Sequence, residues 1–265
     1  MASNQLLNNS RSITSCRNCG EYIEKNYCTH CGQKNSDHRI HLKSLLHDIP
    51  HAIFHVDSGF FFNVKQLFFR PGVAIRDYLE GRRKPFFHPI TYLAILLVFN
   101  LFAVKVTNLH YYDEQELLSM SPKEVQFIKE YDASQWWFLE HTYLYMLIAI
   151  PLCTAFCYYF FRLFKKKFNF AENAIILMFI IAQGVLIQST LYLLTGWVKN
   201  GVFIRGMEMV NFVLMVSYAA FACYRFINPV TKKWKIAVAC TTGGIIILSL
   251  MLASAYLLLG LSKIL

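Results

Sequence analysis

Long apolar blocks dominate the chain after residue 88, whereas polar and charged positions are spread through the segment before it. Five such blocks follow, at residues 89–106, 142–161, 174–197, 207–226 and 236–261. A helix needs about 20 mainly apolar residues to cross a bilayer. The second, third and fifth blocks reach that length without a charged residue, which argues against a soluble all-α core. The pattern predicts an all-α integral membrane protein with about five transmembrane helices in residues 89–265.

The first and fourth blocks satisfy the length requirement less well. The first reaches full length only if Lys105 extends its charged end to the membrane surface. The fourth is bracketed by Glu208 and Arg225. Composition favours the membrane assignment, since 55% of the 265 residues are hydrophobic and 16% are charged. A soluble domain has about a quarter of its residues charged.

Basic residues in the short connections set the expected orientation, because cytoplasmic loops carry an excess of lysine and arginine. Three basic groups lie on one side: Arg82, Arg83 and Lys84; Arg162, Lys165, Lys166 and Lys167; and Arg225, Lys232, Lys233 and Lys235. Residues 107–140 contain seven acidic residues and two lysines and fall on the other side. Lys199 and Arg205 oppose the pattern. We expect a multi-pass inner-membrane (cytoplasmic-membrane) protein with its N-terminus in the cytoplasm and its C-terminus outside.

Residues 1–14 are polar and lack the apolar core of a cleavable signal peptide. We expect a disordered lead there, with the first span acting as an uncleaved signal. Cysteines that follow this lead would lie in the reducing cytoplasm, where thiols stay free to bind metal.

Two cysteine pairs lie in residues 15–35, within the sequences CRNCG and CTHCG. Cys16 and Cys19 form the first pair, and Cys28 and Cys31 form the second. Each CxxC pair presents two thiolates from one tight turn, and four thiolates complete the tetrahedral shell of a structural zinc site. The glycine after each pair suits a turn with positive φ. The repeat predicts a zinc ribbon holding one Zn²⁺; two unrelated redox pairs are the alternative.

A closed shell of four cysteines leaves no open position for water or substrate, so a catalytic zinc is not favoured. His30 is a competing ligand that the shell does not need. The ribbon is too short to bury a core, so metal would supply its folding energy. Its few basic residues are offset by Glu21 and Glu24, which does not favour nucleic acid. We expect a protein contact or a structural clip instead.

The segment 40–88 has apolar residues at helical spacing but is too polar to span a membrane. One stripe consists of Leu42, Leu45, Leu46, Ile49 and Ile53. Further along, Pro71 and Gly81 mark the start and the end of a short helix. We predict three amphipathic helices on the cytoplasmic leaflet. A cationic collar that binds anionic headgroups would follow them, formed by Arg82, Arg83 and Lys84.

Polar residues with chemical potential lie opposite this apolar stripe or just after it: His47, His51, His55, Asp48 and Asp57. Histidines four residues apart on a helix can share a metal ion. However, Pro50 interrupts the helix between the first two. A metal or acid–base site and a plain polar surface therefore both remain open.

Glu208 is an ionisable residue within a predicted span, and such residues are often functional. It also lies at the predicted start of that span, where the helix dipole favours a carboxylate. Four amides are expected to bridge helices rather than line a pathway: Asn100, Gln183, Gln188 and Asn211.

The segments CRNCG…YCTHCGQKN and HVDSGFFFNVKQLFFRPGVAIRDYLEGRRKPFFHPITYL follow one another ahead of and into the first span. In this order of knuckle, Asp-Ser-Gly, Arg-Pro-Gly and Asp-Tyr-Leu-x-Gly-x-Arg, the chain resembles a family of uncharacterised bacterial membrane proteins. That family is found largely in Bacteroidota and is known as domain of unknown function 3667. The resemblance is close over about the first hundred residues. It implies a bacterial membrane protein with an N-terminal zinc ribbon, and it carries no catalytic residue.

The sequence thus favours a non-enzymatic membrane protein whose ribbon docks a protein partner or clamps the interfacial helices. One alternative is a membrane enzyme acting on lipid or envelope precursors through the histidines and aspartates at the inner leaflet. A second alternative is a small transporter that uses Glu208, although the spans hold few polar groups to form a path.

Overall fold

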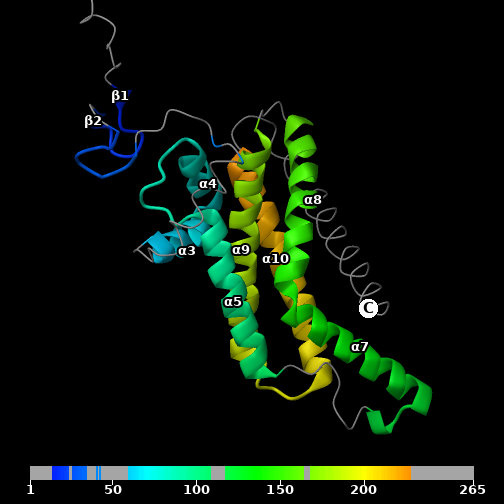
Figure 1. The fold of residues 1–265 in the computed structure, drawn as a ribbon. Coiled ribbons are helices and arrows are strands. Elements are labelled where there is room, and N and C mark those ends of the chain that lie inside the picture. Colours follow the sequence, from blue (N-terminus) through cyan, green and yellow to red (C-terminus); the bar gives the residue numbers. More distant parts are fainter. Residues whose placement is uncertain are drawn as a thin grey trace, which may run out of the picture.

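The computed structural model describes residues 14–23, 26–34, 40, 42, 59–108, 117–163 and 168–227. Within these ranges the protein contains one two-stranded sheet and seven helices (Figure 1). Four of those helices are long and apolar enough to cross a membrane, which confirms the prediction of an all-α membrane protein. The predicted fifth span, the histidine-bearing segment and the predicted lead, except Thr14, lie outside the described residues.

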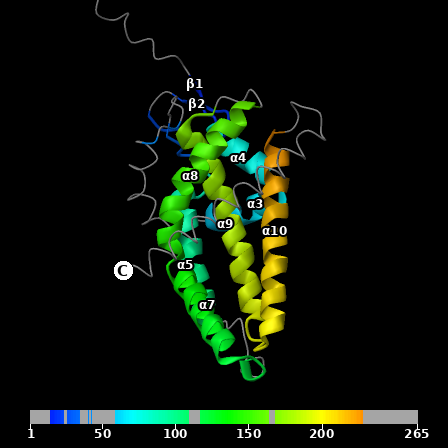
Figure 2. The ribbon, with the colours of Figure 1, turned by 90° about the vertical axis from the view of Figure 1, so that its right-hand side faces the viewer.

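The four long helices correspond to the first four predicted spans: α5 (Pro89–Thr107), α8 (Thr142–Leu163), α9 (Phe170–Thr195) and α10 (Gly201–Ile227). They run in alternating directions between two ends of the molecule (Figures 1 and 2). α9 begins before the predicted residue 174 because Asn169 and Glu172 form a capping box. The Asn169 side chain accepts a hydrogen bond from the Glu172 backbone N–H, and the Glu172 carboxylate accepts one from the Asn169 backbone N–H. Both donor–acceptor distances are 2.8 Å.

α10 also begins earlier than the predicted residue 207. The Asn200 side chain accepts a hydrogen bond from the Phe203 backbone N–H at 2.8 Å, so the helix starts at Gly201. Glu208 consequently lies inside the helix and not at its start. The predicted explanation of this carboxylate by the helix dipole was therefore wrong, because that effect is confined to the first turn.

α9 is the central helix and packs against α5, α8 and α10 (Figure 2). Of its most apolar stretch, 67% of residues are buried, compared with 17% for α10. Polar pairs bridge α5 and α9: the Tyr92 hydroxyl donates to Gln183 Oε1 at 2.9 Å, and Asn100 Nδ2 donates to Ser189 Oγ at 3.1 Å. These pairs confirm the bridging predicted for Asn100 and Gln183, which lipid could not hydrogen-bond.

Two short helices precede the first span, α3 (Gly59–Phe69) and α4 (Pro71–Leu79). Pro71 lies in the first turn of α4, and Gly81 has φ +106° shortly after its end. Both residues therefore occupy the positions that the sequence predicted for them.

The α3–α4 pair packs onto the helix bundle. α4 crosses the end of α10, where a Cβ at Gly72 would overlap the backbone of Arg225 and Phe226. The Arg76 guanidinium donates to the Phe226 carbonyl at 3.2 Å. Buried apolar residues of α3 and α4 belong to the same core cluster as those of α9. One face of α4 is thus covered by the helix bundle. The prediction of a helix lying on the leaflet surface did not include this contact.

α7 (Pro122–Glu140) lies at the end of the bundle opposite α3 and α4 (Figures 1 and 2). Ser121 caps it and forms a capping box with Glu124. At its other end, Glu140 pairs with Lys105, which is in the last turn of α5. The charged end of Lys105 is therefore held by a partner just beyond the apolar part of α5.

Candidate metal centre

The first cysteine pair lies in the turn of a short hairpin. Strands β1 (Thr14–Ser15) and β2 (Tyr22–Ile23) pair in antiparallel fashion. Between them, the Cys16 backbone N–H donates to the Glu21 carbonyl at 2.6 Å, and the Gly20 N–H donates to the Cys16 carbonyl at 2.8 Å. Both bonds hold the turn closed so that its two thiols face one side.

The second pair lies in a turn of the same construction. The Cys28 N–H donates to the Gln33 carbonyl at 2.8 Å, and the Gly32 N–H donates to the Cys28 carbonyl at 2.9 Å. An isolated bridge between Tyr27 and Lys34 replaces the strand pair. Gly20 and Gly32 have φ +83° and +71°, which side chains disfavour. The repeat read from the sequence is thus also a repeat in backbone geometry.

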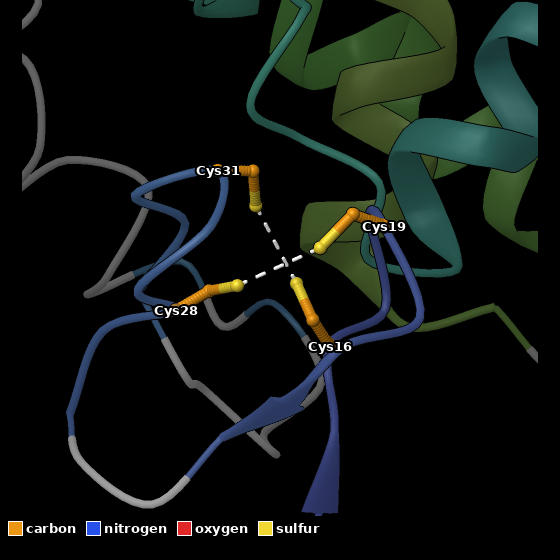
Figure 3. Close-up of side chains that lie close together, drawn as sticks. All are labelled: Cys16, Cys19, Cys28 and Cys31. Atoms are coloured by element: carbon orange, nitrogen blue, oxygen red, sulfur yellow. Dashed lines mark hydrogen bonds between the residues drawn. The ribbon is translucent and has the colours of Figure 1, made fainter.

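The four thiols converge on one point between the two turns (Figure 3). All four Sγ atoms lie within 4.8 Å of one another. Cys16 Sγ and Cys31 Sγ are 3.6 Å apart, and Cys19 Sγ and Cys28 Sγ are 3.5 Å apart. A tetrahedron of thiolates about 2.3 Å from a zinc ion has edges of about 3.8 Å. The cluster can therefore hold a metal ion with little movement.

Little apolar surface supports this ribbon. Its buried hydrophobic residues are Cys16, Ile23 and Cys28, with Cys31 partly buried against them. Cys19 is exposed at the residue level although its thiol faces the other three. Such a small cluster cannot offset the entropy of ordering the segment, so a bound metal is the expected source of stability.

The thiols of the cluster differ in acidity. Partial burial opposes ionisation of Cys31, but hydrogen bonds with the Asn18 side chain and the Gln33 backbone outweigh it and lower its pKa to about 6. A backbone hydrogen bond at Glu21 favours the Cys19 thiolate, yet desolvation and bonds shared with the other thiols raise its pKa to about 12. Metal binding must displace the protons of the thiols that are not ionised, so it is expected to release protons.

Gln33 fastens the ribbon to the turn at residues 81–84, between α4 and α5. Its Nε2 donates to the Gly81 carbonyl at 2.7 Å. Its Oε1 accepts from the backbone N–H groups of Arg83 and Lys84, each at 3.1 Å. Sequence reasoning missed this residue; its only signal was a polar side chain directly after the second knuckle.

The predicted headgroup-binding residues lie in the turn that Gln33 holds. Arg82 is exposed and pairs with Asp77 at 3.3 Å. Arg83 donates to the Tyr78 carbonyl at 3.3 Å and lies over the Tyr78 ring. Lys84 is exposed. Headgroup binding by these three residues stays a prediction.

The remaining candidates lie elsewhere. His47, Asp48, His51, His55 and Asp57 fall outside the described residues. His30 is exposed and is not among the converging ligand atoms. Glu208 accepts a hydrogen bond from the Tyr192 hydroxyl at 2.8 Å, and that hydroxyl accepts one from Gln188.

The family described as Protein of unknown function (DUF3667) matches the chain over residues 57–100. The matched segment covers α3, α4, the turn that holds Gln33, and the first part of α5. It supports the resemblance seen in the sequence for that segment and does not extend to the four cysteines. No curated protein and no solved structure matches the chain.

Proposed function

We propose that the protein is a non-enzymatic scaffold of a bacterial inner membrane, in which a structural zinc ribbon clamps the segment ahead of the first span. The convergence of four Sγ atoms within 4.8 Å carries this proposal. Four cysteine ligands leave no coordination site for a substrate. Tetrahedral thiolate sites bind zinc or iron–sulfur clusters, and paired CxxC turns are typical of structural zinc.

The ribbon has a surface suited to a protein partner. Tyr22 and Tyr27 are 71% and 57% exposed, although the ribbon contains few apolar residues and buries only a small cluster of them. Exposed tyrosines are enriched where proteins contact one another. A partner that covers these two rings would make the ribbon a docking module as well as a clamp.

Metal analysis of the full chain, purified in detergent, tests the proposal. We expect one zinc per chain, lost in Cys28→Ser and retained in Cys223→Ser, which changes a half-buried cysteine of α10. A chain without metal contradicts the proposal. Two metals per chain, one of them surviving Cys28→Ser and lost in His51→Ala, would favour the enzyme alternative.

We further propose that the ribbon end of the bundle faces the cytoplasm. The ribbon, α4, the last part of α10 and the last part of α8 share that end, and the acidic α7 segment lies at the other (Figure 1). The basic turn at residues 81–84 is hydrogen-bonded to the ribbon, and Arg225 lies beside Gly72 of α4. This grouping follows the positive-inside rule. Arg82, Arg83 and Lys84 would then meet the anionic headgroups of the cytoplasmic leaflet.

The exposed face of α3 supports a position at that leaflet. Phe61, Phe68 and Phe69 are 78%, 53% and 65% exposed, while Asn63 and Leu67 are buried on the opposite face. Phenylalanines on one face of a short helix suit the boundary between headgroups and acyl chains. Alkaline phosphatase fused after residue 140 should be active outside the cytoplasm, and a fusion after residue 227 should be inactive. The reverse pattern would contradict this orientation.

The two alternatives draw less support from the structure. The histidines and aspartates of the enzyme alternative lie outside the described residues. Glu208, on which the transporter alternative rests, is engaged by Tyr192 between α9 and α10. Such a bond explains a carboxylate in this place without a transported ion.

A further inference from the structure

We propose that the turn at residues 81–84 belongs to the metal centre, so that metal binding by the ribbon and the order of this turn depend on one another. The inference rests on the proposed structural zinc. It assigns Gln33 and Lys84 as residues that position and stabilise the metal-bound ribbon without contacting the metal.

Gln33 joins the second knuckle and the turn within one residue. Its backbone carbonyl accepts from the Cys28 N–H at 2.8 Å, which closes the knuckle around a ligand. Its side chain makes three hydrogen bonds to the backbone of the turn, one to Gly81 and one each from Arg83 and Lys84. Opening the knuckle moves this residue and breaks those bonds.

Arg17 connects the first knuckle to the same turn. It lies between the ligands Cys16 and Cys19, and its aliphatic stem rests on Gly81, where a Cβ would come within 2.6 Å of Arg17 Cδ. Both knuckles therefore touch one short turn. Only a ribbon whose two halves are fixed relative to one another, as a shared metal ion fixes them, presents Arg17 and Gln33 together.

Lys84 places a positive charge beside the second knuckle. Its Cε and Nζ both lie 3.9 Å from the position a Cβ would occupy on Gly32, the residue after Cys31. Zn²⁺ with four thiolates carries two net negative charges, more than the metal-free cluster, in which most thiols keep their protons. An ammonium at this position therefore favours the metal-bound form over the metal-free form, since opposite charges attract.

The turn is also in contact with the helix bundle, which holds it in place for the ribbon. The Arg83 guanidinium lies 5.9 Å from the centre of the Tyr78 ring. Tyr78 packs edge-on against Phe179 of α9, with ring centroids 5.2 Å apart. Coupling between two sites is reciprocal. The free energy by which bound zinc stabilises the ordered turn therefore equals the free energy by which the ordered turn stabilises zinc binding.

Chelator competition on the full chain in detergent measures the zinc affinity of Gln33→Ala and Lys84→Gln. We expect Gln33→Ala to weaken zinc binding about tenfold, through the loss of three hydrogen bonds. Lys84→Gln should weaken it about threefold, the effect of one exposed charge. The matched controls are Gln126→Ala and Lys123→Gln, both exposed on α7 at the far end of the bundle, and they should bind zinc as the unmodified chain does.

Hydrogen exchange on the unmodified protein provides a second measurement. It uses no substituted variant, so misfolding of a variant does not affect it. The amides of Arg83 and Lys84 donate to Gln33, so chelation should speed their exchange about tenfold. The coupling is overturned if chelation leaves the exchange of these two amides unchanged, or if both variants bind zinc as tightly as the unmodified chain. Either result leaves the proposal of a structural zinc in place. A wild-type chain that binds no zinc overturns the proposed function together with this inference.

Discussion

The ribbon and the α5–α9 pair stand at opposite extremes of how this chain stabilises its fold. The ribbon buries three hydrophobic side chains and gathers four thiols. α9 buries most of its length against its neighbours, in a cluster that includes α3, α4 and α5. Under the proposed function, the first region depends on a metal ion that a chelator can remove, whereas the second depends on the packing of its own side chains.

Glycine shows the same difference on a smaller scale. Gly20 has φ +83° and open space around it, so it supplies backbone conformation. Gly72 has an ordinary helical conformation in α4 but no room for a Cβ beside α10, so it supplies space. One residue type thus serves a turn in one region and a helix crossing in the other.

Metal removal should separate the two regions most strongly. We expect a chelator to speed hydrogen exchange at the Gly20 and Gly32 amides at least about 100-fold, because structural zinc contributes roughly 10 kcal/mol or more to folding of small sites. Amides of Phe170–Thr195 should keep their protection. Exchange that accelerates equally in α9 would show that the ribbon is not an independent unit of stability.

Gly72→Ala should have the next largest effect, in the bundle. The new methyl group overlaps the backbone of Arg225 and Phe226, so α4 must separate from α10 at a cost of about 3 kcal/mol. Thermal unfolding in detergent should show a lower midpoint with zinc content unchanged. The control is Gly206→Ala in α10, where nothing lies within 4 Å of the new Cβ; it should raise the midpoint slightly. An unaltered midpoint for Gly72→Ala would contradict the close crossing.

Tyr92→Phe should have the smallest effect of the three. It removes one hydrogen bond to Gln183 inside the bundle, where both side chains are fully buried, and we expect a loss of about 1 kcal/mol. A denaturant titration in mixed micelles would measure it. The comparison is Tyr143→Phe, which alters an exposed tyrosine of α8 and should change little. Equal effects from both substitutions would count against a stabilising role for this pair.

The sequence predicted the features that depend on local pattern. The spacing of Cys16, Cys19, Cys28 and Cys31 needs only two turns of fixed length, and the structure brings these residues together. Span positions follow from hydropathy, which does not depend on tertiary contacts. The bridging role of Asn100 and Gln183 follows from the scarcity of hydrogen-bond partners in lipid.

What the sequence did not predict depends on residues far apart in the chain. Gln33 meets Gly81 across 48 positions, and no short pattern announces such a contact. The close approach of Gly72 to Arg225 depends on how two helices cross. The early start of α10 was missed because Asn200, a good helix cap, precedes residues that do not resemble the middle of a span.

The contact between Arg76 and Phe226 has a consequence for how the protein is made, since the two residues are 150 positions apart. A ribosome adds about 5–20 residues per second, so α4 waits roughly 8 to 30 s for its partner to be synthesised. The ribbon, by contrast, is complete before α4 emerges. If the ribbon holds the proposed zinc, a cell short of zinc would leave both regions of the nascent chain open at once, and proteases would reach the N-terminal segment before the bundle could close.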